Sequence, residues 1–211
     1  MGIINKGILG GFSGKVGTVI GGTWKGIDYM RSQSSSKRSS FTQPQLEQQA
    51  KFALSVKFLQ PIAGLLAVSF KDYAIKMTGF NNALRYTLTN AVSGSYPAYT
   101  VDYSMALVSR GDLPNALSPA ASSAGGGVNF TWTNNAGTGK AMPTDKSILV
   151  VYCPAKNQCI YTTTGPERST QAGSLAVSSF IGEQVETYIG FISEDGKVIA
   201  SSAFTGTLTV A

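Results

Sequence analysis

The side chains with the most reactive chemistry in this sequence are Cys153 and Cys159, in a chain that contains no histidine. Ordinary zinc sites and nucleophilic dyads or triads use histidine, so the sequence predicts none of them. The two cysteines flank residues 154–158, a predicted turn between two strands, and a disulfide across this hairpin is one hypothesis. Two reduced thiols are the alternative, which we expect for freshly made protein in the cytoplasm.

Carboxylates gather in the C-terminal part of the sequence, as Glu183, Glu186, Glu194 and Asp195. Paired carboxylates act as general acid and base only where they converge on one substrate. Here the first two border a predicted strand and the last two fall in a predicted tight turn, which are common positions for solvated charges. We therefore predict a protein that is not an enzyme and that has no cofactor or metal site.

The glycine-rich start of the chain contains a Gly14-Lys15 pair, which invites comparison with a phosphate-binding P-loop. That motif also needs a glycine five residues before the pair and a serine or threonine after it, where this chain has Leu9 and Val16. The spacing therefore does not support a phosphate site. Glycines that permit close approach to a neighbouring sheet are the better interpretation.

Apolar side chains alternate with these glycines through residues 1–31, a segment with no means of burying them alone. Ordering so flexible a backbone has a high entropic cost unless a large partner surface compensates. We predict an extended arm that docks on a neighbouring subunit and adds a strand to an exposed sheet edge. Its predicted assembly residues, with Trp24 as the anchor, are Phe12, Val16, Ile20, Trp24, Ile27 and Tyr29.

The arm and the linker after it also carry most of the net charge of +6. Asp28 is the one acid in residues 1–40, whereas the remainder of the chain is almost neutral. Such asymmetry is typical of a segment that contacts a polyanion, although scattered lysines can also keep an apolar arm soluble before it docks. The possible polyanion contacts are Lys6, Lys15, Lys25, Arg31, Lys37 and Arg38.

Helical patterns follow the polar linker at residues 32–40. Thr42 and Gln45 form a capping-box pattern at the start of a helix that should break at Pro61. Two further helices are predicted over residues 62–70 and 81–91. The apolar run at residues 58–70 is about half of what a bilayer needs, so it predicts a buried helix and no transmembrane segment.

Beyond Gly94 the pattern changes to short runs of β-branched and aromatic residues separated by glycine, proline and asparagine. The clearest hairpin runs from Tyr188 to Phe204 around an Asp195-Gly196 turn. Trp132 is interpreted as a core residue between two sheets. The predicted strands are residues 101–108, 128–133, 147–153, 158–164, 174–177, 186–193 and 197–208.

The predicted fold class is therefore α+β, mainly β. It comprises an extended glycine-rich N-terminal arm with its linker (residues 1–40), a small helical layer (41–95) and a C-terminal immunoglobulin-like antiparallel β-sandwich (96–211). At 211 residues and 43% hydrophobic content, the chain is large enough to bury a substantial core. The low share of charged residues, 13%, favours packed, assembling proteins.

Two resemblances extend this interpretation. The order of residues 128–132, 149–152 and 187–191, with an early tryptophan and a late tyrosine, resembles fibronectin type III and related immunoglobulin-like domains. The segments 10–17 (GGFSGKVG), 24–26 (WKG), 82–84, 102–104 and 109–111 resemble an uncharacterised domain family of Bacteroidota bacteria and their mobile elements. The second resemblance implies a small non-catalytic protein with a glycine-rich N-terminus and is consistent with phage association.

The leading functional hypothesis is a structural subunit that self-assembles through its arm into a homo-oligomer, as a phage virion component or a filament subunit. One alternative is a nucleic-acid-binding protein that uses the basic arm, with Trp24 and Tyr29 as stacking groups. Another is a cell-surface adhesion or carbohydrate-binding module. Because no signal peptide is recognisable, we expect synthesis in the cytoplasm and a final location in an assembled particle.

Overall fold

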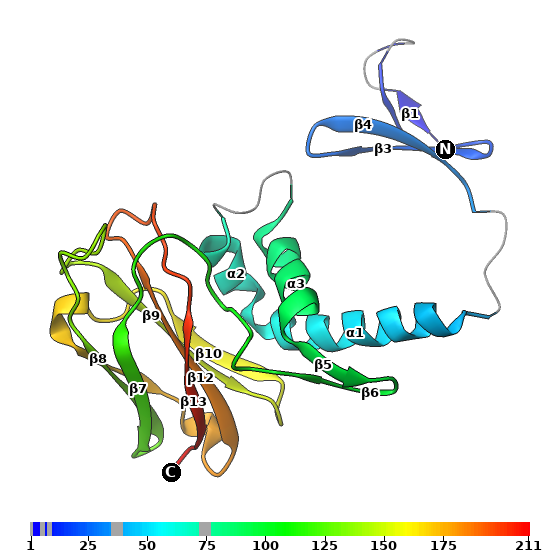
Figure 1. Ribbon diagram of the computed structural model, residues 1–211. Coiled ribbons are helices and arrows are strands. Elements are labelled where there is room, and N and C mark those ends of the chain that lie inside the picture. Colours follow the sequence, from blue (N-terminus) through cyan, green and yellow to red (C-terminus); the bar gives the residue numbers. More distant parts are fainter. Residues whose placement is uncertain (1, 5–6, 8–9, 35–39, 72–76) are drawn as a thin grey trace. The chain divides into compact units, whose positions relative to one another are not determined.

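The computed structural model describes residues 2–4, 7, 10–34, 40–71 and 77–211 of the chain. The chain divides into two compact units, Met1–Gln43 and Pro44–Ala211 (Figure 1). The helices expected over residues 41–95 and the sandwich expected over residues 96–211 both fall in the second unit. The fold is α+β and mainly β, as the sequence predicted.

In the N-terminal unit, the described residues form a four-stranded antiparallel sheet, here called the arm sheet. Its strands, in spatial order, are β1 (Ile3–Ile4), β2 (Phe12–Val16), β3 (Val19–Trp24) and β4 (Ile27–Ser32). The arm therefore differs from the extended segment that was predicted. Residues 12–32 already form hairpins with one another, so β2 and β3 are not available as single strands for addition to another sheet.

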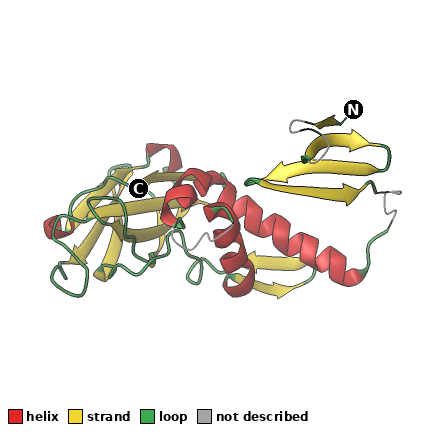
Figure 2. Ribbon diagram, turned by 90° about the horizontal axis from the view of Figure 1, so that it is seen from above, coloured by secondary structure: helices red, strands yellow, loops and turns green. Residues whose placement is uncertain are grey.

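The second unit begins with the predicted helices, interrupted by a 3-10 turn at Pro61: α1 (Gln43–Leu59), η1 (Gln60–Ile62), α2 (Ala63–Ser69) and α3 (Gly79–Asn90). The Thr78 hydroxyl accepts a hydrogen bond of 3.2 Å from the Asn81 backbone N–H and so caps the start of α3. A hairpin of β5 (Val92–Ser95) and β6 (Ala98–Val101) follows and lies beside α1 in Figures 1 and 2.

The helical stretch Gln43–Ser69 is long and apolar enough to cross a membrane by length and composition alone. Core helices of soluble proteins meet the same criteria. In this structure Phe58, Leu59, Ile62 and Leu66 are at most 2% exposed and belong to a hydrophobic core. The packing therefore favours the buried helix that the sequence predicted.

The sandwich occupies most of residues 96–211, all of which are described. Strands β11, β8 and β7 form one antiparallel sheet of this region, and β10, β9, β12 and β13 form the other; most of these strands are labelled in Figure 1. The strands are β7 (Leu117–Ala124), β8 (Gly127–Thr133), β9 (Lys146–Cys153), β10 (Gln158–Thr162), β11 (Ala172–Ala176), β12 (Gln184–Ile192) and β13 (Ala203–Thr209). Short 3-10 turns stand before β11 and β12, as η2 (Arg168–Thr170) and η3 (Ser178–Phe180).

The connectivity of these strands is immunoglobulin-like. Counted from β7, the third, sixth and seventh strands lie in one sheet and the first, second and fifth in the other. The fourth strand, β10, pairs with the third. The predicted immunoglobulin-like sandwich is therefore confirmed.

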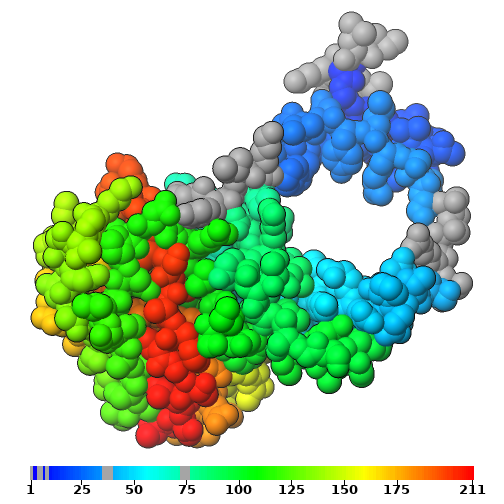
Figure 3. Space-filling view, in the orientation of Figure 1, coloured from blue at the N-terminus to red at the C-terminus, as the bar shows by residue number. Residues whose placement is uncertain are grey.

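The sheet that contains β9 and β12 is buried on both faces, which explains why these two strands are apolar almost throughout. One face packs on the helices and the other on the smaller sheet. Side chains on the helical face include Ile148, Val150 and Tyr188, and those on the opposite face include Leu149, Val151 and Ile189. The helices and the sandwich form one continuous body (Figure 3).

Trp132 lies in the core between the two sheets, as predicted. It is 4% exposed, and its ring meets Phe191 edge-on at a centroid distance of 5.6 Å. The indole Nε1–H donates a hydrogen bond of 2.9 Å to the Arg168 carbonyl oxygen. This buried tryptophan therefore has both apolar contact and a polar partner.

One predicted strand, residues 101–108, is wrong beyond its first residue, and the observed strand β7 was not predicted. Residues 102–108 form turns and loop, in which the Met105 backbone N–H bonds to the Asp102 carbonyl oxygen at 3.2 Å. Strand β7, with the sequence LSPAASSA, was not predicted because it lacks the β-branched and aromatic residues typical of strands. Antiparallel pairing with β8 stabilises β7 as a strand, although its own sequence does not predict one.

The hairpin between β12 and β13 is confirmed by the pairing of Tyr188 with Phe204. Strand β13 begins later than predicted, at Ala203. The residues just before it bond to another segment: the Leu113 N–H donates to Ile199 and the Ser202 N–H donates to Ser109, each at 3.0 Å. These residues also keep contact with β12, because the Ala200 N–H donates to the Phe191 carbonyl oxygen at 2.7 Å and Ile192 forms an isolated antiparallel bridge with Ile199.

Candidate assembly surface

Tight turns of suitable geometry join the strands of the arm sheet. Lys25 and Gly26 connect β3 to β4, and both have positive φ, 48° and 80°. Positive φ at both central residues is the signature of the type I′ turn, whose twist matches that of antiparallel strands. Gly17, with φ of 59°, occupies the turn between β2 and β3. The glycines of this segment thus support hairpins.

Two further glycines make room for aromatic rings on the arm sheet. A Cβ atom at Gly21 would collide with the backbone and ring of Phe12, and one at Gly22 would meet the hydroxyl end of Tyr29 at 3.0 Å. Each ring therefore lies against backbone that carries no side chain. This arrangement covers strand glycines with aromatic surface, a known device for stabilising glycine-containing sheets.

The strand register divides the predicted assembly residues between two faces. Residues directly opposite each other in antiparallel strands share a face, and successive residues alternate. One face, here called the apolar face, carries Phe12, Val16, Val19 and Met30. The other, here called the basic face, carries Lys15, Ile20, Trp24, Ile27, Tyr29 and Arg31. The six predicted residues therefore do not form one surface.

Both faces expose large side chains to an unusual degree. On the apolar face Val16 is 54% and Met30 72% exposed, and on the basic face Trp24 is 50% and Ile27 64% exposed. A single-layer sheet with few buried side chains is marginal in water, because burial of apolar area is the main stabilising term. The described part of the arm sheet therefore gains little stability from burial of its own apolar side chains.

The possible polyanion contacts are only partly brought together. Lys15 and Arg31 share the basic face, on either side of Ile20, to which both are paired. The Lys25 ammonium lies 5.3 Å from the centroid of the adjacent Trp24 ring. The other predicted contacts, Lys6, Lys37 and Arg38, lie outside the described residues.

The structure does not place Cys153 and Cys159 for a disulfide, which corrects the hairpin hypothesis. In the ladder of β9 and β10, Cys153 is opposite Gln158 and Cys159 is opposite Tyr152. This offset of one residue points the two thiols to opposite faces, one between the sheets and the other towards the helices. Both cysteines are free, and burial raises the pKa of the Cys159 thiol to about 12.

The C-terminal carboxylates are not brought together either. Glu183 and Glu186 lie at the start of β12, whereas Glu194 and Asp195 follow the other end of that strand. Asp195 accepts hydrogen bonds from the Ser193 hydroxyl and the Lys197 N–H, which lower its pKa to about 2. Among the described residues, no group of three or more acidic or cysteine side chains is placed to hold a metal ion.

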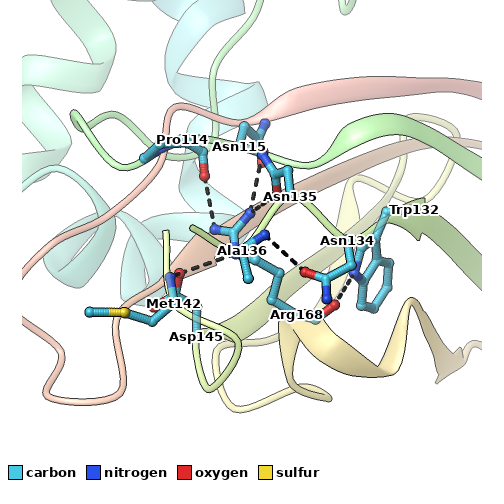
Figure 4. Close-up of polar contacts among 9 residues, drawn as sticks. All are labelled: Pro114, Asn115, Trp132, Asn134, Asn135, Ala136, Met142, Asp145 and Arg168. Carbon is cyan, nitrogen blue, oxygen red and sulfur yellow. Dashed lines mark hydrogen bonds and ion pairs between the residues drawn. The ribbon is translucent and has the colours of Figure 1, made fainter. Parts of the chain in front are cut away.

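A buried ionic cluster at one end of the sandwich was not found by sequence reasoning (Figure 4). Arg168 is 0% exposed, and its Nε donates to the Asp145 carboxylate at 3.1 Å. Its remaining nitrogens donate to Asn135 Oδ1 at 2.6 Å and to the carbonyl oxygens of Pro114 and Asn115 at 2.8 and 3.3 Å. The guanidinium also lies 3.9 Å from the ring centroid of Phe191.

This cluster joins loops that are far apart in the sequence. Asp145 also accepts a 2.9 Å hydrogen bond from the Met142 N–H, and the Asn135 amide donates to the Asn115 carbonyl at 2.8 Å. Because each charged group has several hydrogen-bond partners, the cluster holds together the loops at this end of the sandwich. The sequence offered no periodic pattern or motif that would have indicated it.

Comparison with protein-family models gives a match that covers most of both the arm sheet and the body. A family model, described as a family of unknown function (DUF6266), matches residues 11–206. The chain belongs to this family. The DUF6266 match begins beside β2 and ends within β13, so it includes most of the arm sheet as well as the body. No curated protein and no solved structure matches the chain.

Proposed function

We propose that this DUF6266 protein is a non-catalytic structural subunit that self-assembles through its arm sheet, as a phage virion component or a filament subunit. The observation that carries the proposal is the apolar face of that sheet, on which Val16, Val19 and Met30 are exposed and Phe12 is half-buried. The choice of particle depends on the sequence resemblance to proteins of mobile elements.

A second copy of the chain is the partner that this face suits. Two sheets that pack face to face form a sandwich with a core about 10 Å thick, and the paired apolar faces would supply that core. The one acid of the arm, Asp28, lies on this face near the turn that follows β3 and accepts a hydrogen bond from Thr23. Its position at the end of the sheet places it at the rim of such an interface, where charges are tolerated.

The test is the oligomeric state of the full-length protein, measured by size-exclusion chromatography with light scattering. Val16→Lys places a charge in the apolar face and is expected to convert the oligomer to monomer. Ile27→Lys is the matched control, because Ile27 is similarly exposed on the same sheet but points to the other face. An oligomer that survives Val16→Lys, or a wild-type protein that is monomeric at high concentration, would overturn the proposal.

The particle assignment needs its own measurement. Negative-stain imaging of the purified assembly is expected to show rings, shells or filaments built from repeated copies. Assembly that stops at a simple dimer would contradict the filament and virion assignment while leaving self-association intact.

A further inference from the structure

The basic face differs from the apolar face in both charge and aromatic content. Lys15 and Arg31 both lie on it and are solvent-exposed. Asp28 is the one acid in residues 1–43, and the register places it on the opposite face. The basic face therefore presents positive charge with no carboxylate of its own sheet to neutralise it.

Two aromatic rings lie among these cations. Trp24 on β3 and Tyr29 on β4 are 50% and 48% exposed. They are diagonal neighbours, because Trp24 is opposite Ile27 and Tyr29 is two residues further along. Side chains related in this way are separated by roughly 7–8 Å, within reach for large rings. Gly22 beneath Tyr29 has no side chain, which lets the ring lie over the backbone.

We propose that the basic face binds single-stranded nucleic acid. Unpaired bases stack on exposed aromatic rings whatever their sequence, and cations beside the rings contact the phosphates. Trp24 and Tyr29 are the stacking residues, and Lys15 and Arg31 are the phosphate contacts. A duplex is a poorer ligand, because its bases are already stacked on one another and offer no free face to the rings.

The charge of this face also argues against a second copy as its occupant. Packing two basic faces together would bring Lys15 and Arg31 near the same residues of the other chain, and like charges at an interface are destabilising. An anionic polymer removes this conflict. The assignment goes beyond self-assembly, because it concerns the face that the proposed subunit contact leaves uncovered.

The test measures binding of full-length protein to fluorescent oligo(dT) of about 15 nucleotides, a length within the range of known single-strand sites. Wild-type protein is expected to bind with an affinity that falls as salt rises. Replacing both Lys15 and Arg31 by glutamine should weaken binding about tenfold and reduce the salt slope by about 1.4, since each phosphate contact on a single strand contributes about 0.7.

A matched variant distinguishes binding at the basic face from general electrostatic attraction of nucleic acid to a basic protein. Lys57→Gln with Lys140→Gln removes the same charge from exposed positions in the body and should leave binding within about twofold. Trp24→Leu with Tyr29→Leu should weaken binding at least fivefold, which corresponds to about 1 kcal/mol of stacking. Circular dichroism of each variant establishes that it is folded.

Intrinsic fluorescence provides a second readout. Trp132 is buried, so quenching by oligo(dT) should come from Trp24 and should disappear in Trp24→Phe. The proposal fails if the body variant loses as much affinity as Lys15→Gln with Arg31→Gln, if binding is insensitive to salt, or if a duplex of equal length binds more tightly. Val16→Lys should still bind oligo(dT), so failure of the proposed assembly would be distinguishable from failure of this inference.

Discussion

Arg168 is the single residue on which the end of the sandwich most depends, because its guanidinium binds Asp145 and three other oxygen acceptors inside the protein. Arg168→Met keeps an unbranched apolar stem in place of the arginine methylenes but leaves the Asp145 carboxylate buried without its cation. We expect it to lower the free energy of unfolding by about 3–5 kcal/mol, measured by urea denaturation.

The neighbouring ion pair is the control. Lys146 and Glu167 are 2.9 Å apart, but their side chains are 38% and 42% exposed. Lys146→Gln should therefore cost less than about 1 kcal/mol. Equal effects of Lys146→Gln and Arg168→Met would mean that the buried cluster has no special structural role.

Glu186 gives the stability of the protein a pH dependence. It is 7% exposed, burial raises its pKa, and the Thr207 hydroxyl donates a 2.8 Å hydrogen bond to its carboxylate. Because the pKa is higher in the folded state than in the unfolded one, the folded state binds more protons between the two values. Glu186 therefore lowers stability as pH rises through that window.

Glu186→Gln should consequently raise the free energy of unfolding at pH 7. The gain should shrink as pH falls through this window and be lost below the usual glutamate pKa, where Glu186 is protonated in both states. Urea denaturation at a series of pH values measures this difference. Glu183→Gln, at a half-buried position just before the same strand, where the carboxylate lies 3.8 Å from the Lys156 ammonium, is the control. A gain for Glu186→Gln that does not vary with pH would contradict the argument.

At the scale of the element, the register of the β9–β10 hairpin decides the state of the cysteines. The thiols of Cys153 and Cys159 point to opposite faces of the sheet, so no disulfide can form without a change of register. Alkylation of unfolded protein without reductant should modify both residues, and the native protein should react slowly because both are largely buried. A mass shift that requires reductant would show that a bridge exists.

At the scale of the whole molecule, the body should fold without the arm. All described residues of its two hydrophobic cores come from Val56 onwards, and the arm sheet belongs to a separate compact unit. A chain that starts at Ser40 should remain folded with a free energy of unfolding within about 0.5 kcal/mol of the full-length value at a concentration where both are monomeric. It should not self-associate. An unfolded truncation, or one that keeps the full-length oligomer, would refute this division of roles.

The sequence by itself determined the features that depend on local pattern. Helical spacing and the break at Pro61 located the helices, and the alternation of Val128, Phe130 and Trp132 located a sandwich strand whose inward side chains are all buried. The concentration of positive charge near the N-terminus and the lack of histidine are also properties of the sequence alone.

Tertiary structure decided everything that depends on which segments meet and in what register. The Arg168 guanidinium donates hydrogen bonds to Asn115 and Asn135, which are far away in the chain. No local sequence pattern encodes such partners. The two faces of the arm sheet, and the opposite directions of Cys153 and Cys159, follow from strand pairing. A shift of one residue in strand pairing moves every side chain to the other face of the sheet. Composition therefore predicted an apolar, basic arm, whereas only the strand register separated its apolar face from its basic face.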